Sequence, residues 1–424
     1  MCFTRRRLPG VRRALLLVML ALSTLVAACS ADEGVALTQW RLFVDGGVQD
    51  VGVTLPAHLD HNLPEKHVRF VLRARVELPA SLRDRALTLA IPSLLARCTL
   101  DVDGVAMSAL DADDSDGYRG NGHPRWSIPA TRTHERAIDL ALTVDHTWTQ
   151  SGWLDTAPRL SATLAGDADY RRLRSFNGVS AIGALTAAIF VLFAYVILLA
   201  LDRSQRAVRW FVLEGLTATL YPAFNLGLTA SVFGIYDAPI MAVTLVVTIW
   251  ASVRFTHAQF KLPPPHWVWH LPLVISIVAA LLFPGPFDAT KRVAPITVAA
   301  VALNVAYQLV VTARLARVPE HAVHARVLFI SWTALGATGI VDFAAWLGLG
   351  ALAGGARTAC VGIVIIAILQ SAVLSRDHVI ALARAAVLNR EIRDQLDHVE
   401  RKNAENELLN GELRRQIAAR TEHL

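Results

Sequence analysis

The sequence predicts a multi-domain membrane protein with an exported all-β sandwich, a seven-helix transmembrane bundle and a C-terminal parallel coiled coil. Of its 424 residues, 54% are hydrophobic and only 18% are charged, and the mean hydropathy is +0.42. Apolar stretches long enough to cross a bilayer recur between residues 179 and 375. The segment before them alternates with period two, and the segment after them has a helical heptad pattern. A soluble core does not need this much apolar surface.

The net charge of +6 and the pI of about 9.4 do not indicate a nucleic-acid partner. The basic residues are distributed over the N-terminus, the short loops and the C-terminal helix, whereas nucleic-acid binding needs them in one compact patch. The lipid bilayer is the partner that this composition predicts.

Residues 1–29 have the pattern of an export signal. Five arginines among the first thirteen residues precede an apolar run, 14–28, that is short for a membrane span. The run ends in Val26-Ala27-Ala28-Cys29, which resembles a bacterial lipobox and implies lipidation of Cys29. An ordinary signal peptide or an uncleaved anchor remains the alternative. In each case the segment that follows is exported.

Residues 35–170 predict a β-sandwich. Within 68–78 the even positions are all apolar and most odd positions are charged, so one face of this strand is buried and the other is wet. The stretch 138–144 repeats the pattern. Asp103-Gly104 interrupts 99–107 and predicts a two-residue hairpin turn. No long helical period intervenes, so an all-β domain follows.

The order of these strands resembles that of a galactose-binding-type jelly roll, on the segments 76–79, 86–89, 100–104 and 126–129. The resemblance implies a module that binds sugars through aromatic residues in its loops and that sometimes holds a structural calcium ion.

Five residues are candidates for binding a carbohydrate-like ligand: Trp126, Trp148 and Trp153, with Gln150 and Asp155 beside them. An indole offers a flat apolar face to a sugar ring, and an amide or a carboxylate can hold its hydroxyl groups. The alternative is that the tryptophans close the sandwich core or rest on its membrane-facing end.

The acidic loop 111–117 contains four carboxylates, the oxygen ligands that calcium prefers. It lacks the twelfth-position glutamate of an EF-hand loop, so a solvated acidic turn is the favoured interpretation. The sequence therefore predicts neither a metal nor a cofactor.

Residues 176–375 predict the transmembrane domain, with spans at 179–201, 208–228, 239–259, 267–283, 293–316, 325–347 and 355–375. Arginine or lysine marks the first, third and fifth loops, and the second and sixth loops contain neither as these spans are drawn. Lys291 and Arg292 in the fourth loop oppose this trend. The positive-inside rule then places the chain in a bacterial inner membrane, with the β domain in the periplasm and the C-terminus in the cytoplasm.

Three ionisable residues lie within the predicted spans: Glu214, Arg254 and Asp342. An unpaired charge facing lipid costs several kcal/mol, so each needs a partner or access to water. Glu214 and Arg254 are at similar depth and could pair; alternatively, Arg254 reaches the headgroups. Asp342 is near the outer end of its span, where water or a loop group can satisfy it. Pro222 and Pro272 are expected to kink their helices.

Residues 376–424 predict a parallel two-stranded coiled coil that joins two copies of the chain. Apolar residues fit alternating heptad positions, with Asn403 and Asn410 at a positions in the middle of the seam. Asparagine at an a position sets register and dimer number at a cost in stability. A solvated single helix is the alternative.

An exported jelly roll, seven spans and a cytoplasmic helix together resemble the bacterial seven-transmembrane receptors with diverse intracellular signalling modules. The resemblance implies a receptor that senses a small extracellular ligand and controls a kinase or cyclase output module. No kinase or nucleotide-binding motif occurs in the chain, so we expect no enzyme within these residues and a longer receptor or a separate output partner.

The sequence fits two other classes of membrane protein less well than it fits a receptor. A light-driven rhodopsin needs a lysine in its last span, and 355–375 contains none. A transporter is expected to show repeated halves, for which the sequence has no convincing pattern. A membrane transporter, or a docking protein without signalling output, remains the alternative function.

Overall fold

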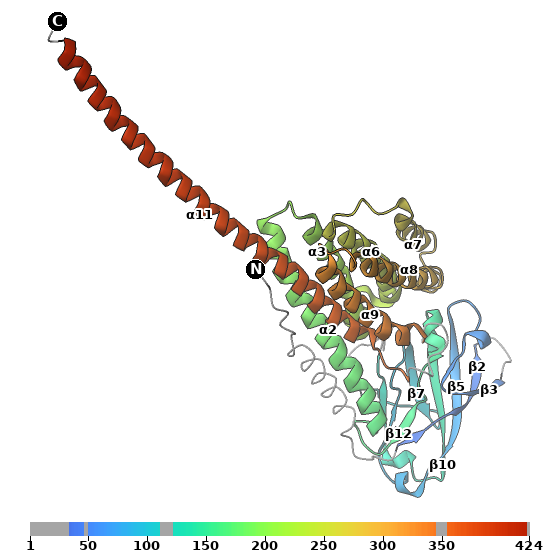
Figure 1. Ribbon diagram of the computed structural model, residues 1–424. Helices are drawn as coiled ribbons and strands as arrows, with labels where there is room; N and C mark the ends of the chain where they lie inside the picture. Colours follow the sequence, from blue (N-terminus) through green and yellow to red (C-terminus); the bar gives the residue numbers. More distant parts are fainter. Residues whose placement is uncertain (1–33, 46–49, 111–121, 345–353, 422–424) are drawn as a thin grey trace. The chain divides into compact units, whose positions relative to one another are not determined.

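The computed structural model describes residues 34–45, 50–110, 122–344 and 354–421 (Figure 1). The predicted signal segment with Cys29 and the acidic loop 111–117 lie outside these residues. Among those described, the residues up to Ile368 form one compact unit and those from Leu369 onward form a second. The β region and the bundle are therefore parts of one compact unit.

The N-terminal region is all-β, as predicted, and contains two main antiparallel sheets. One has the strand order β3-β2-β5-β10-β7-β8, the other has the order β1-β12-β6-β9, and β4 pairs with β11 separately. The strands are β1 (Val35–Ala36), β2 (Gln39–Val44), β3 (Asp50–Thr54), β4 (Ala57–His58), β5 (Val68–Glu77), β6 (Leu87–Ala90), β7 (Arg97–Val102), β8 (Val105–Ala106), β9 (Arg125–Ile128), β10 (Ala137–His146), β11 (Trp153–Leu154) and β12 (Arg159–Ser161).

Strands β5 and β10 pair along their whole length and form the centre of the larger sheet. Their period-two pattern directs Phe70 and Leu72 of β5, and Leu142 of β10, into the core. Leu89 and Leu160 of the smaller sheet are buried in the same cluster. Two half-exposed sheets thus share one apolar core, and the predicted strand alternation is confirmed.

The predicted turn at Asp103-Gly104 joins β7 to β8. Val102 pairs with Val105, and both turn residues have positive φ, +50° for Asp103 and +75° for Gly104. Two consecutive residues with positive φ are the requirement of a type I′ hairpin, which an aspartate followed by glycine meets at low cost.

Trp126 does not lie in a loop, contrary to the sequence-based expectation. It is in β9, pairs with Leu89 of β6 and is buried in the shared core with 2% of its surface exposed. The pairing turns the indole inward, because neighbouring residues of a strand face opposite sides of the sheet. Trp126 therefore supports the packing of the two sheets and is not available to a ligand at the surface.

The helical part consists of α2 (Ala168–Leu201), α3 (Arg206–Ala218), α4 (Leu220–Asn225), α5 (Ala230–Phe233), α6 (Asp237–Gln259), α7 (Leu271–Leu282), α8 (Pro286–Leu315), α9 (Ala322–Ala344) and α11 (Ala359–Thr421). Five helical stretches in the described residues are long and apolar enough to cross a membrane, and 267–282 is a shorter apolar helix. The predicted second span, 208–228, is divided between α3 and α4.

Two prolines explain the interrupted segments. Pro222 has no N–H to donate to the carbonyl of Ala218, and the helix is interrupted between those two residues, consistent with the predicted kink. Pro272 instead lies in the first turn of α7. A missing N–H costs nothing there, so Pro272 begins a helix and does not kink one.

The first transmembrane helix is anchored in the β region, because α2 begins about three turns before its apolar stretch. Asp167 accepts a hydrogen bond from the Tyr170 backbone N–H (2.9 Å) and also pairs with Arg159 near the end of the sandwich. The hydroxyl of the buried Tyr170 donates to the carbonyl of His123 (2.8 Å). These contacts fix the start of α2 to the β region.

A second set of contacts joins the β region to the bundle through Trp148. Its indole N–H donates to the carbonyl of Ile235 (2.9 Å), and its ring packs with Phe224, Ala238 and Met241. With none of its surface exposed, Trp148 is an interface residue between the two layers.

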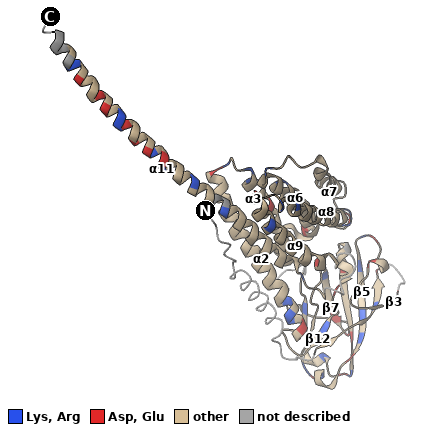
Figure 2. Ribbon diagram, in the orientation of Figure 1, with Lys and Arg blue, Asp and Glu red and all other residues tan. Residues whose placement is uncertain are grey.

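The second unit is the greater part of α11, which continues as one helix to Thr421. Figure 2 shows acidic and basic residues in alternation along it, whereas the bundle helices carry few charges. Ile392, Leu396, Val399 and Leu413 are each about half exposed. They follow the predicted spacing of three and four residues, so an apolar stripe is open on the single chain.

The buried position of His146 predicts that the stability of the folded chain depends on pH. Its ring lies edge-on to Phe287 of α8 (5.2 Å), and burial, together with the nearby His67, lowers its pKa from 6.5 to about 4. The unfolded chain binds this proton near pH 6.5, but the folded chain does so only near pH 4. The group therefore removes on the order of 3 kcal/mol of stability as the pH falls through that window.

The measurement is thermal unfolding of the full chain in detergent between pH 7 and about pH 4, followed by tryptophan fluorescence. His146→Phe retains the aromatic packing without the titration and should show a shallower loss of stability. The same pH dependence in both proteins would contradict this assignment.

Candidate functional site

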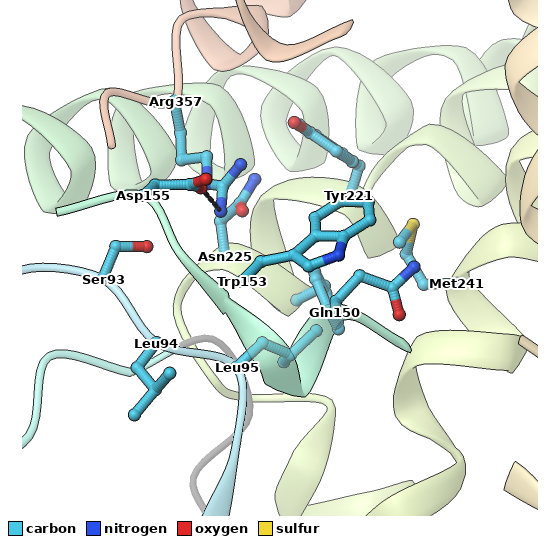
Figure 3. Close-up of a pocket in the computed structure, with 11 residues that line it drawn as sticks. Ser93, Leu94, Leu95, Gln150, Trp153, Asp155, Tyr221, Asn225, Met241 and Arg357 are labelled. Carbon is cyan, nitrogen blue, oxygen red and sulfur yellow. Dashed lines mark ion pairs between the residues drawn. The ribbon is translucent and has the colours of Figure 1, made fainter. Parts of the chain in front are cut away.

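A small cavity lies where the β region meets the bundle (Figure 3). It is lined by Ser93, Leu94, Leu95, Gln150, Trp153 and Asp155 from the β region, and by Tyr221, Phe224, Asn225, Met241 and Arg357 from the helical part. Its volume is about 30 Å³. A space of this size holds on the order of two water molecules, so a larger ligand requires its walls to separate.

A tight turn after β10 brings three predicted residues to this cavity. The Trp148 backbone N–H donates to the Ser151 hydroxyl (3.0 Å), and Ser151 donates its own N–H to the Trp148 carbonyl (3.0 Å). The turn directs Trp148 to the bundle and places Gln150, Trp153 and Asp155 in the cavity wall. Short polar residues after a strand could have indicated such a turn.

Asp155 joins the β region to the helical part. Its carboxylate lies 2.8 Å from Nε2 of His58 and 3.7 Å from Nη2 of Arg357 (Figure 3 shows the pair with Arg357). The side chains are 5%, 13% and 16% exposed respectively, so the charges are largely shielded from water. Desolvation offsets much of the attraction in such a cluster, but removal of one partner leaves an uncompensated buried charge and is costly.

Trp153 is held in place by the same part of the β region. Its indole stacks on His58 at 4.5 Å between ring centroids, and its N–H donates to the carboxylate of Asp60. Burial raises the pKa of Asp60, although the bond from Trp153 opposes this shift. The Trp153 ring is therefore preorganised in the cavity wall.

Arg357 is one of the site residues that the sequence-based prediction missed, as are Tyr221 and His58. The predicted last span included Arg357, but α11 begins at Ala359, so Arg357 lies in the segment before the helix. Asn177 of α2 holds that segment: its amide donates to the Gly355 carbonyl (3.0 Å) and accepts from the Arg357 N–H (2.8 Å). The cost of an arginine within a span could have indicated the later helix start.

Asp342 holds the first turn of α11. Its carboxylate accepts hydrogen bonds from the backbone N–H groups of Thr358 (2.7 Å) and Ala359 (3.1 Å). These donors have no intrahelical partner and lie at the positive end of the helix dipole. The hydroxyl of Tyr221 donates to the same carboxylate (2.7 Å). The cavity wall and the start of α11 thus meet at one buried side chain.

Arg254 lies toward the end of α6 that is opposite to this cavity, and Glu214 lies in the second half of α3. The Arg254 guanidinium is 5.0 Å from the ring of Trp210 and 4.6 Å from that of Trp250, and its Nη2 is 2.8 Å from Nε2 of His270. These contacts do not include Glu214; whether the guanidinium also reaches the headgroups stays a prediction. Glu214 is 7% exposed, on α3.

The cavity thus unites Gln150, Trp153 and Asp155 of the five predicted ligand residues, while Trp148 lies behind its wall and Trp126 lies in the sandwich core. In the described parts of the chain, no group of three or more histidine, cysteine, aspartate or glutamate side chains could hold a metal ion.

Comparison with solved structures gives a weak similarity in about a third of the chain. The match to β-glucuronidase from Ruminococcus gnavus covers 32% of this chain and 30% of the enzyme chain, with 11% sequence identity and a TM-score of 0.26. Its complex with D-glucuronic acid gives a TM-score of 0.27 over 31% of that chain. The match spans less than a third of that enzyme and is too weak to support a conclusion about activity. No curated protein matches the chain significantly.

The helical part gives a specific match. Residues 180–377 match the family described as 7TM diverse intracellular signalling, which covers the helices from α2 to the beginning of α11. The matched range coincides with the predicted transmembrane domain and confirms the resemblance found in the sequence. The transmembrane region of this chain therefore belongs to the seven-transmembrane receptors with diverse intracellular signalling.

Proposed function

We propose that a small, carbohydrate-like ligand acts at the cavity between the β region and the bundle, and that its presence is relayed to α11. The observation that carries this proposal is the position of Tyr221. Its side chain lines the cavity, and its hydroxyl bonds to Asp342, the residue that holds the N-terminus of α11. A change in the cavity wall therefore acts directly on the start of this helix.

The groups around the cavity have the chemistry that a sugar needs. Trp153 supplies an aromatic surface, while the Gln150 and Asn225 amides and the Arg357 guanidinium supply hydrogen-bonding groups. A sugar ring is much larger than the present cavity, so binding includes separation of its walls. The Asp155–Arg357 ion pair joins the β-region wall of the cavity to its helical wall. Separation of the two walls would break this ion pair.

The available energies are sufficient for such a relay. A tenfold preference of the ligand for the open state supplies about 1.4 kcal/mol. A hydrogen bond to a charged group, such as that from Tyr221 to Asp342, contributes about 1.5–3 kcal/mol. The two terms are similar, so occupancy of the cavity can shift the balance between two arrangements of this bond.

The proposal continues to the second unit. Two copies of α11 would pair as a parallel coiled coil through the exposed apolar stripe, with Asn403 and Asn410 setting the register. The polar centre makes this seam weaker than an all-leucine one. A modest energy at the start of the helix is then enough to change the pairing that a cytoplasmic output partner reads.

The proposed location is a bacterial inner membrane with the β region in the periplasm. Loop charge supports it, although Lys291 and Arg292 oppose the trend and the structure adds Arg357 to the loop before α11. Lys291 pairs with Glu65, whose pKa it lowers, and Arg357 pairs with Asp155. These two charges are offset within the protein, so they weigh little against the positive-inside rule.

The relay predicts that Tyr221→Phe separates binding from response. The variant lacks only the hydroxyl, so it should still bind a monosaccharide but lose the effect of that sugar on disulfide cross-linking at Val399→Cys. Tyr236→Phe, the same change outside the cavity lining, is the matched control and should respond as the parent does.

Trp153→Ala should instead weaken sugar binding itself, by about 1–3 kcal/mol for loss of one buried aromatic contact. Binding is measured with a panel of neutral and acidic monosaccharides by calorimetry on the full chain in nanodiscs. A sugar response that survives in Tyr221→Phe contradicts the relay, and absence of binding in the parent contradicts the ligand class.

The coiled coil predicts that Asn403→Leu with Asn410→Leu strengthens the dimer. Each leucine buried in the seam adds roughly 1.5–3 kcal/mol, so dimer dissociation should fall more than tenfold. Sedimentation of the full chain in detergent measures this change. His398→Leu, outside the seam, should have little effect; equal strengthening by it would reject the proposed register.

The orientation predicts opposite labelling of two single cysteines. Arg75→Cys lies on the exposed face of β5 and Glu405→Cys on the exposed α11 helix. In intact cells an impermeant maleimide should label the first only, and after lysis it should label both, with the parent chain as background. Labelling of Glu405→Cys in intact cells would reverse the assignment.

A further inference from the structure

A second cavity lies near the ends of α3 and α6 that are farthest from the β region. It is lined by Arg206, Arg209, Trp210 and Leu213 of α3 and by Arg254 of α6, and its volume is about 470 Å³. The four residues of α3 recur at intervals of three and four, so they form one face of the helix. Arg254 is about 20 Å along α6 from Met241 of the first cavity, by the rise of an α-helix. The two cavities are therefore separate.

The lining carries three positive charges. Arg206 and Arg209 are exposed, and among the described residues that line the cavity none is acidic. The nearest acidic residue on the preceding loop, Asp202, is engaged by the Ser204 N–H (2.9 Å) and hydroxyl (2.7 Å). Uncompensated guanidinium groups around a hollow favour an anion.

Arg254 gives a second indication of a ligand. The rings of Trp210 and Trp250 and the imidazole of His270 fix the guanidinium, but its Nε is buried and has no hydrogen-bond partner within the described structure. A buried donor without a partner costs about 1–3 kcal/mol. A ligand that accepts from this nitrogen would remove the cost, and this is a reason to expect one.

We propose that this cavity binds the phosphate of an anionic phospholipid headgroup. Guanidinium groups hold phosphate oxygens through paired hydrogen bonds, and basic pockets between transmembrane helices suit such headgroups. Trp210 and Leu213 supply apolar surface for the glycerol and the upper acyl chain. The volume lies within the range of small-ligand sites. Free phosphate shares this chemistry, so the experiment must distinguish the two sources.

The test uses the purified full chain in detergent, with phosphatidylglycerol and phosphatidylcholine offered in equal amounts and adducts counted by native mass spectrometry. The parent should retain phosphatidylglycerol preferentially, and Arg206→Gln with Arg209→Gln should weaken its binding on the order of tenfold. Both residues are exposed, so the variant is expected to fold. Arg203→Gln, on the same loop but outside the lining, is the matched control and should bind as the parent does.

A second measurement isolates Arg254 and the phosphate source. Arg254→Lys keeps the charge but loses the planar fork, so it should bind the lipid more weakly than the parent while it remains folded. Phosphatidylglycerol should raise the unfolding temperature of the parent, and millimolar inorganic phosphate should not. Equal protection by inorganic phosphate would overturn the lipid assignment. Unchanged lipid retention in the Arg206→Gln, Arg209→Gln variant, or equal loss in Arg203→Gln, would overturn the site.

Discussion

The carboxylate of Asp155 lies between His58 and Arg357, and the coupling of the two layers depends on this shielded cluster of charges. His58 belongs to the β region and Arg357 to the segment that leads into α11, so one side chain links the β region to the start of α11. Asn177 fixes the same segment to α2. A shielded ion pair is poor evidence of stability, but loss of one partner is costly. That property suits the contact that, in the proposed function, a ligand would break.

The same rule, that charge away from water needs a partner, explains the ionisable residues of the bundle. Asp342 accepts the N–H groups at the start of α11, where the helix itself leaves donors unsatisfied. Arg254 contacts two indoles and an imidazole. Each residue has a structural partner, and each also borders a cavity or contacts a residue that does. These two ionisable residues are therefore located at, or next to, the two candidate binding sites.

The two ends of the helical bundle differ in what their residues contact. At one end, α4 and α6 contribute Phe224 and Met241 to the contact with Trp148 of the β region. At the other end, α3 and α6 enclose the arginine-lined cavity. The interruption near Pro222 separates the segment that carries Tyr221 from α3.

Local patterns in the sequence were sufficient for much of this protein: the alternation in β5 and β10, the Asp103-Gly104 turn and the transmembrane region. These features depend on neighbouring residues and on segment length, which the sequence displays directly. The site depended on contacts between distant residues. Trp126 is buried where β9 pairs with β6. Arg357 lies before the first residue of α11, outside the helix, and pairs with Asp155. Only tertiary packing decides such pairings, because no local pattern relates residues that are 37 positions apart, as Leu89 and Trp126 are, or 202 apart, as Asp155 and Arg357 are.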